Sequence, residues 1–403
     1  MTSLDSSPTL SVWRMLLALA VVFVLLATSG WTTLRDQRGP VGARETALAS
    51  WTHGRIGHRA LPDPAAPART IAAFFRSIGP AQGARLADAH PFVVGNLNGA
   101  PLTLRYRANR LSLAHALGAE RGRVEDPRLS ATGRHEALRR VHRFASLMRQ
   151  DRQILAFDPT GPGRTAEVLG DLERAQRVSV IVPGVDTNLL TFQKTHRKYS
   201  APAGMAESLY AAERRAAPRA RTAVIAWADY TAPVGVGIDA AIGRLAAIGS
   251  VRLVDMVAAL PGGSRVSIFC HSYGSVLCGV AAPRLPARVT DVAVAGSPGM
   301  RVESAAELAT RARVWAMRDA DDWIRDVPNL DLGGVGHGAD PAEPEFGARL
   351  LSAAGATGHA GYFEPGTDSL DNFAAIGVGS YRSLTCAGTD SACRSGISGA
   401  EGA

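Results

Sequence analysis

From about residue 153 onward, short apolar runs alternate with segments whose apolar residues recur at helical spacing. The predicted strands cover residues 154–157, 178–182, 223–227, 266–270, 289–294 and 314–317. The predicted helices between them cover residues 204–217, 238–260 and 273–282. Strands that are apolar throughout and alternate with helices favour an α/β fold, in which a mostly parallel sheet is covered on both faces. In such a sheet the reactive groups lie in the loops at the carboxyl ends of the strands.

The chain before residue 153 is organised differently. Residues 32–90 are polar and contain Pro and Gly, with one short helix predicted over residues 71–78, so we interpret them as a linker or a packed N-terminal extension. Helical spacing returns over residues 134–149. We therefore expect helices ahead of the sheet, an α/β domain over residues 91–385 and a C-terminal tail over residues 386–403.

An uncharged apolar stretch runs from Met15 to Ala27 and extends weakly to Trp31. Its length and its place at the N-terminus predict either a signal peptide or a short transmembrane helix over residues 1–31. Ala27-Thr28-Ser29 would serve as a small-residue cleavage site. We expect the rest of the chain outside the cytoplasm, either secreted or held at the cell membrane by this segment.

The composition is that of a globular protein with a sizeable core, since 46% of the 403 residues are hydrophobic and 20% are charged. A formal net charge of +8 is compatible with binding to nucleic acid. However, only Lys194 and Lys198 are lysines, so 42 of the 44 basic residues are arginines, and these are scattered along the chain. A basic block interleaved with aromatics is missing from the sequence, and we expect no nucleic-acid partner.

The four cysteines fall into two groups. Cys270 and Cys278 lie inside apolar runs and are interpreted as small buried residues. Cys386 and Cys393 lie among Gly, Ser and Thr, where they could close a small loop in an oxidising compartment. The Cys and His spacings match no metal site, so we expect neither a metal nor a cofactor.

The sharpest chemical motif is the run FCHSYGS at residues 269–275. An apolar strand leads directly into Ser272, and a helix-compatible run follows. A serine on such a tight strand-to-helix turn, or nucleophile elbow, projects its hydroxyl out of the sheet. The alternative is a serine that only caps the helix. Hydrolases with this turn usually have Gly two residues before the serine, where this chain has Cys270.

A nucleophilic serine needs a histidine base, and the base needs an acid to orient it. In α/β hydrolases these follow the serine in the order acid, then histidine. Only His337 and His359 follow Ser272, and His359 is preferred because it lies near the end of the domain, whereas His337 is interpreted as a loop residue. The acid is expected after the strand at residues 314–317, with Asp322 preferred, then Asp321, then Asp319.

An oxyanion hole needs two backbone N–H groups. We expect one from Tyr273, directly after the nucleophile, and one from Val185, in the Pro-Gly turn after the strand at residues 178–182. An ordinary β-turn is the alternative for Val185. The loop at residues 228–233 follows another strand and is expected to line the substrate entrance.

Six segments occur in an order that resembles an α/β-hydrolase family of unknown function, typical of high-GC Gram-positive bacteria. They are GNLNG (95–99), ILAFDPTGPGRTAEVLGD (154–171), VIVPGVDTN (180–188), FCHSYGS (269–275), AGSPGM (295–300) and GHAGYFEPGTDSLDNF (358–373). The resemblance implies an α/β-hydrolase fold, Ser272 as nucleophile, His359 as base and an aspartate of residues 319–322 as acid. The family's usual Gly is Cys270 here, and the resemblance implies no substrate.

Together these observations predict an esterase- or lipase-like serine hydrolase that forms an acyl-enzyme on a carboxylic ester, either a small molecule or a lipid. Two other functions stay open from the sequence. An acyltransferase would use the same Ser-His-Asp triad with an alcohol as acceptor, and a binding protein could keep the fold without turnover.

Overall fold

The computed structural model describes residues 41–327, 331–332, 335–388 and 392–397. The predicted signal peptide or transmembrane segment at residues 1–31 lies outside these described residues. Within them, no helix combines the length and the apolar character that crossing a membrane requires.

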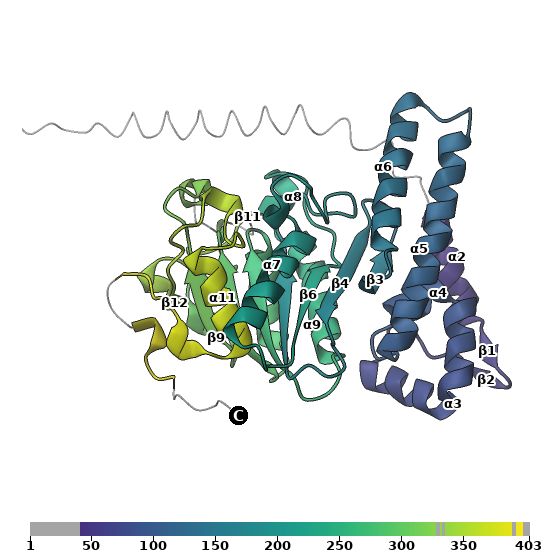
Figure 1. The fold of residues 1–403 in the computed structure, drawn as a ribbon, viewed down its shortest axis with the longest axis horizontal. Helices are drawn as coiled ribbons and strands as arrows, with labels where there is room; N and C mark the ends of the chain where they lie inside the picture. Colours follow the sequence, from purple (N-terminus) through teal and green to yellow (C-terminus); the bar gives the residue numbers. More distant parts are fainter. Residues whose placement is uncertain (1–40, 328–330, 333–334, 389–391, 398–403) are drawn as a thin grey trace, which may run out of the picture.

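The N-terminal part of the described chain is a helical unit (Figure 1). Its elements are α2 (Val41–Thr52), β1 (Arg55–Ile56), β2 (Arg59–Ala60), α3 (Ala68–Ala89), α4 (Pro91–Asn96), α5 (Leu102–Glu125) and α6 (Ala131–Leu147). The helix predicted over residues 71–78 is part of the longer α3, which bends at Gly79 and Pro80.

The helical unit has its own apolar core, built around Trp51, Phe74, Phe75 and Val94. Residues from α2, α3, α4 and α5 all contribute to it. Residues of α2 and α3 are therefore packed in this unit, and Pro91, which we expected to begin the α/β domain, is the first residue of α4 and belongs to the same unit.

Eight strands form the main sheet. They are β3 (Gln153–Asp158), β4 (Arg164–Gly170), β5 (Arg177–Val182), β6 (Thr222–Ala228), β7 (Arg265–His271), β8 (Val289–Ala295), β9 (Arg313–Met317) and β12 (Arg349–Leu350). Their spatial order is β12-β9-β8-β7-β5-β6-β4-β3, and β4 runs in the direction opposite to the other seven strands. Counted along the chain, the order is 8-7-6-5-3-4-2-1. The predicted mostly parallel sheet is thus confirmed, whereas β4 and the short β12 were not predicted.

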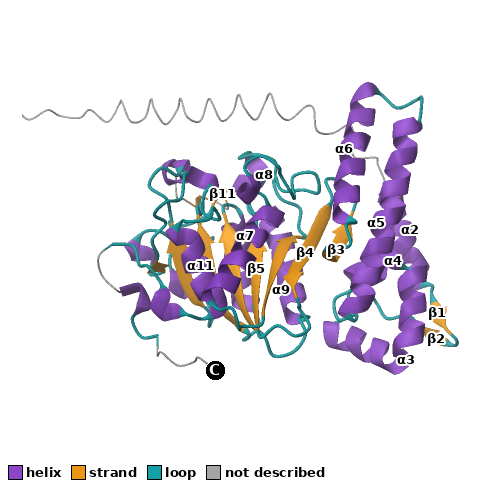
Figure 2. Ribbon diagram, viewed as in Figure 1, coloured by secondary structure: helices purple, strands orange, loops and turns teal. Residues whose placement is uncertain are grey.

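Helices cover both faces of the sheet (Figure 2). One face packs against α7 (Pro202–Ala216) and α11 (Asp368–Val378), and the other against α9 (Arg244–Ala258) and α10 (Gly274–Ala281). The helix predicted over residues 238–260 is divided into α8 (Ile238–Ala241) and α9, because Gly243 takes a left-handed conformation with φ of 64°. A small hairpin of β10 (Asp331–Leu332) and β11 (Val335–Gly336) follows β9.

Both cysteine pairs are disulfides. Cys270 in β7 and Cys278 in α10 are buried, as predicted, but they are bonded to each other, which the sequence did not predict. They come together because the chain reverses between the strand and the helix. Cys386 and Cys393 form the second disulfide and close a short loop, as the sequence allowed.

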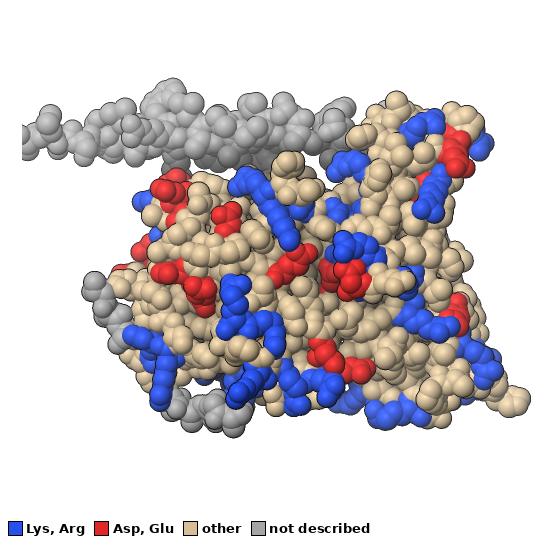
Figure 3. Space-filling model, viewed as in Figure 1, with Lys and Arg blue, Asp and Glu red and all other residues tan. Residues whose placement is uncertain are grey.

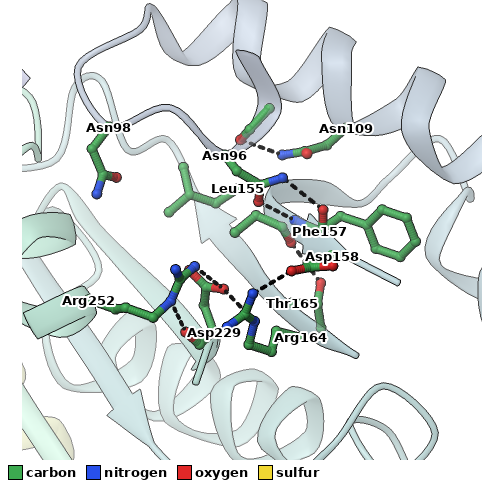
Figure 4. A network of polar contacts seen from close by, with 12 residues as sticks. Asn96, Asn98, Asn109, Leu155, Phe157, Asp158, Arg164, Thr165, Asp229 and Arg252 are labelled. Carbon is green, nitrogen blue, oxygen red and sulfur yellow. Dashed lines mark hydrogen bonds and ion pairs between the residues drawn. The ribbon is translucent and has the colours of Figure 1, made fainter. Parts of the chain in front are cut away.

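Side chains of the helical unit cover the outer edge of β3 (Figure 4). The amide of Asn96 accepts from the N–H of Phe157 at 3.0 Å and donates to its carbonyl at 2.8 Å. Asn109 donates to the carbonyl of Ile154 at 2.9 Å, and Arg105 donates to that of Leu155 at 2.9 Å. These bonds take the place of a neighbouring strand and dock the helical unit on the sheet.

A chain of ion pairs continues from this edge toward β6. Asp158 pairs with Arg164, which lies 3.8 Å from Asp229, and Asp229 accepts two hydrogen bonds from Arg252 of α9 (Figure 4). Elsewhere, on the face shown in Figure 3, basic and acidic side chains are interspersed over both parts of the molecule. On this face the basic side chains are spread over the molecule and are not gathered in one patch.

Candidate active site

Ser272 lies on the sharp turn between β7 and α10. Its φ of 55° is left-handed, a conformation that a non-glycine residue adopts only when its surroundings hold it there. The Ser272 N–H donates to the carbonyl of Ala295 at 3.0 Å, and its own carbonyl accepts from Ser275 N–H at 2.8 Å. The turn is thus fixed to β8 on one side and to the first turn of α10 on the other.

Three side chains from three different loops meet at this turn. Nε2 of His359 lies 2.8 Å from Oγ of Ser272. On the other side of the ring, Nδ1 lies 2.8 Å from Oδ1 and 3.0 Å from Oδ2 of Asp322. The serine follows β7, the aspartate follows β9 and the histidine follows β12, so the shared carboxyl edge of the sheet brings them together.

Asp322 is fully buried, and its carboxylate is hydrogen-bonded to three groups. Burial raises the pKa of its carboxyl, but hydrogen bonds from His359, Tyr362 and the Ile324 N–H outweigh burial, so the pKa lies below its ordinary value. The group is therefore a carboxylate at neutral pH, suited to orient His359 and to stabilise a positive charge on the imidazole.

The other two candidate acids lie elsewhere. Asp321 is exposed. Oδ2 of Asp319 accepts from the Gly358 N–H at 2.8 Å and so supports the loop that carries His359. Of the three aspartates, the structure brings only Asp322 to the histidine.

The second candidate histidine, His337, is not bonded to Ser272. It is buried, and its ring packs edge-on against that of Tyr273 with 5.9 Å between centroids. Its backbone carbonyl accepts from Arg301 N–H at 2.6 Å. The structure thus gives His337 a packing position beside the elbow.

The two backbone N–H groups expected to form an oxyanion hole are those of Tyr273 and Val185. Within the described part of the chain, neither the N–H of Tyr273 nor that of Val185 has a hydrogen-bond acceptor. Gly184, directly before Val185, lies so close to the nucleophile that a Cβ there would stand 2.9 Å from Ser272 Oγ. The loop after β5 therefore passes directly beside the serine.

The loop after β6 holds the loop after β5 in place. The Tyr230 hydroxyl donates to the Pro183 carbonyl at 2.6 Å, and the Pro233 carbonyl accepts from Asp186 N–H at 2.8 Å. The Asp186 carboxylate accepts in turn from Gly235 N–H at 2.8 Å. The loop at residues 228–233 is thus bonded to the loop that passes beside the nucleophile.

Reasoning from the sequence missed three side chains that touch the Ser-His-Asp cluster. The Tyr362 hydroxyl donates to Asp322 Oδ2 at 2.6 Å. His271 Nε2 donates to the His359 carbonyl at 2.6 Å, and burial, followed by the nearby His359, lowers the pKa of His271 to about 3. The half-exposed Trp323 ring lies 4.8 Å from that of His359. In the sequence, these residues could have been found only by their closeness to the candidate triad, since each lies within three residues of Ser272, Asp322 or His359.

A family model described as alpha/beta hydrolase matches residues 158–332, which include Ser272 and Asp322. The eight-stranded sheet, its helical layers and this match agree. The chain has an alpha/beta-hydrolase fold. This finding supports a hydrolase and leaves its substrate open. In the described part of the chain, no three His, Cys, Asp or Glu side chains are grouped as metal ligands would be.

Two relatives are uncharacterized proteins from two strains of Mycobacterium tuberculosis, each 28% identical to this chain over 378 residues. The alignment covers 79% of this chain and 57% of each relative, so the chain spans little more than half their length. Among solved structures, a predicted CIB-like hydrolase from Thermoplasma acidophilum is 18% identical, with 57% of this chain and 97% of that chain covered and a TM-score of 0.35. A dienelactone hydrolase from Anabaena variabilis is 17% identical, with 44% and 79% covered and a TM-score of 0.29.

Proposed function

We propose that this protein is a serine hydrolase that cleaves a carboxylic ester through an acyl-enzyme, with Ser272 as nucleophile, His359 as base and Asp322 as the orienting acid. The observation that carries the proposal is the continuous hydrogen-bonded chain from Ser272 Oγ through the His359 ring to the Asp322 carboxylate, with 2.8 Å at each step. A serine hydroxyl becomes a competent nucleophile when a base so placed can accept its proton.

In the proposed reaction, Ser272 Oγ attacks the ester carbonyl carbon while His359 Nε2 takes the hydroxyl proton. The N–H groups of Tyr273 and Val185 hold the negative oxygen of the tetrahedral intermediate. The bond to the alcohol oxygen then breaks, and His359 returns its proton to that oxygen. Water repeats the sequence on the acyl-enzyme, releases the carboxylic acid and restores Ser272.

The test is labelling of the full chain with a fluorophosphonate probe, followed by hydrolysis of short-chain esters. We expect labelling of the wild type and its loss in Ser272→Ala and His359→Ala. Two matched controls, Ser200→Ala and His196→Ala, change the same residue types at the surface loop near α7 and keep labelling. A folded wild-type chain that never labels would contradict the proposal and favour a binding protein with the same fold.

We also propose that the hydrolase domain acts outside the cytoplasm, either secreted or held at the membrane by residues 1–31. The support is the uncharged apolar sequence from Met15 to Ala27. Cell fractionation with N-terminal sequencing distinguishes the two forms, since a cleaved signal peptide leaves a new N-terminus near Ser29. A chain found intact in the cytoplasm would contradict both.

A further inference from the structure

Trp323 is an exposed aromatic residue held directly beside the reactive centre. Its neighbours Asp322 and Ile324 are both buried, and the Asp322 carboxylate accepts from Ile324 N–H at 2.9 Å, so the backbone on both sides is fixed. Trp323 itself is 47% exposed, and its ring lies 4.8 Å from that of His359 at an angle of 47°. A large apolar surface is thus presented to solvent at the edge of the site.

The proposed chemistry defines which part of a substrate meets this surface. Because His359 Nε2 must return its proton to the departing oxygen, the alcohol portion of the ester must lie next to the His359 ring. The carbonyl oxygen must lie on the other side of Ser272 Oγ, toward the N–H groups of Tyr273 and Val185. A side chain packed against His359 therefore borders the alcohol portion of the ester.

We propose that Trp323 is the contact surface for the leaving alcohol and that this alcohol is uncharged and apolar, either aliphatic or aromatic. This inference rests on the proposed ester hydrolysis. An indole face loses contact with water when an apolar group covers it, and burial of that shared area favours such alcohols over small polar ones. Trp323 is on this basis a specificity-determining residue of the reaction.

The experiment uses the full chain and a series of butyrate esters that differ only in the alcohol: methyl, hexyl, benzyl and glyceryl. In the wild type we expect the highest kcat/KM for hexyl and benzyl butyrate. In Trp323→Ala, we expect kcat/KM for these two to fall about tenfold while that for methyl butyrate changes less than twofold. Trp323→Phe should recover part of the loss, and Leu138→Ala, at an exposed apolar position on α6, should change none of the four.

Two further readouts separate a substrate contact from an effect on His359. All four esters give the same butyryl-enzyme, so Trp323→Ala should leave the deacylation rate and the pH profile unchanged. A uniform loss across the series, or a shifted pH profile, would overturn the inference while leaving the hydrolase function intact. Choline butyrate tests the charge: if its kcat/KM exceeds that of its neutral isostere 3,3-dimethylbutyl butyrate, the leaving group is cationic and the proposal is wrong.

If the wild type neither labels with fluorophosphonate nor hydrolyses methyl butyrate, the proposed function itself fails. That outcome is distinct from an active esterase that is indifferent to Trp323.

Discussion

The hydroxyl of Tyr362 donates a 2.6 Å hydrogen bond to Oδ2 of Asp322, the same carboxylate that contacts Nδ1 of His359. The same hydroxyl accepts from the Asp319 N–H at 3.0 Å, so one phenol joins the acid to the start of its own loop. Burial, and then the bond to Asp322, raise the pKa of Tyr362, so the group remains a donor throughout the neutral range. Tyr362 is thus a positioning residue for the proposed acid.

Replacing Tyr362 with Phe should lower kcat about tenfold with little change in KM, because a hydrogen bond to a charged group contributes about 1.5–3 kcal/mol and Asp322 would be held less firmly. Steady-state kinetics on a short-chain ester would measure it. Tyr381→Phe is the matched control, since the Tyr381 hydroxyl donates to Asp291 at 2.8 Å, away from the Ser-His-Asp cluster. Equal activity losses in both variants would contradict a specific role for Tyr362.

A methyl group at Gly184 should slow the reaction of the nucleophile about 100-fold without unfolding the domain. The added Cβ would stand 2.6 Å from Ser272 Cβ, which forces the loop after β5 away from the nucleophile. Displacement of reacting groups by about 1 Å costs about 100-fold in rate, and we expect that loss in the fluorophosphonate labelling rate of Gly184→Ala. Gly122→Ala on α5, where a Cβ meets nothing within 4 Å, should label normally. Wild-type labelling by Gly184→Ala would show that the loop is not needed there.

His271 should make the folded state sensitive to mild acid. Its pKa is about 3 in the folded chain and 6.5 as an ordinary histidine, so below pH 6.5 the unfolded chain binds a proton that the folded chain does not. The free energy of unfolding should therefore fall by up to about 1.4 kcal/mol per pH unit from this residue as the pH drops from 6.5 toward 3.

Urea unfolding of the wild type and of His271→Gln at pH 7, 6 and 5 would measure this dependence, above the range in which most carboxylates titrate. The slope should be smaller in His271→Gln and unchanged in His196→Gln, whose histidine is exposed. Identical slopes in all three proteins would rule out a neutral, buried His271.

The two disulfides provide a matched pair, because their cysteines are separated by 8 and 7 residues. Loops of this size predict a similar loss of about 2–3 kcal/mol in the free energy of unfolding when either bond is removed. Only the Cys270–Cys278 bond spans the turn that carries Ser272. We therefore expect Cys270→Ala/Cys278→Ala to label several-fold more slowly with fluorophosphonate, and Cys386→Ala/Cys393→Ala to label at the wild-type rate. Equal labelling rates would mean that the backbone alone fixes the serine.

The sequence predicted the parts of this molecule that have a recognisable pattern along the chain. Six of the eight strands, Ser272 and Asp322 follow from apolar runs and from the residues at the ends of those runs. His359 follows from its position after Ser272 and near the end of the domain. β12, with two residues, and β4, which carries the polar residues Thr165 and Glu167, lack the run of apolar residues that identifies a strand.

The missed features depend on contacts between distant segments. Tyr362 meets Asp322 across 40 positions, and His271 meets the carbonyl of His359 across 88. The Cys270–Cys278 bond spans a strand, a turn and a helix, so each cysteine has the apolar surroundings of a core residue. Pairings of this kind are determined by the tertiary fold, and periodicity along the chain carries no signal for them.

The side chains of Asn96, Asn109 and Arg105 occupy hydrogen-bonding positions along the free side of β3. A second copy of the sheet that approached this side would find those carbonyls already satisfied and a layer of helices in the way. The folded chain therefore cannot associate with a second copy by joining the two sheets through β3. Such association would become available only if the helical unit came away from the domain, so damage to that unit should appear first as aggregation and only later as lost chemistry.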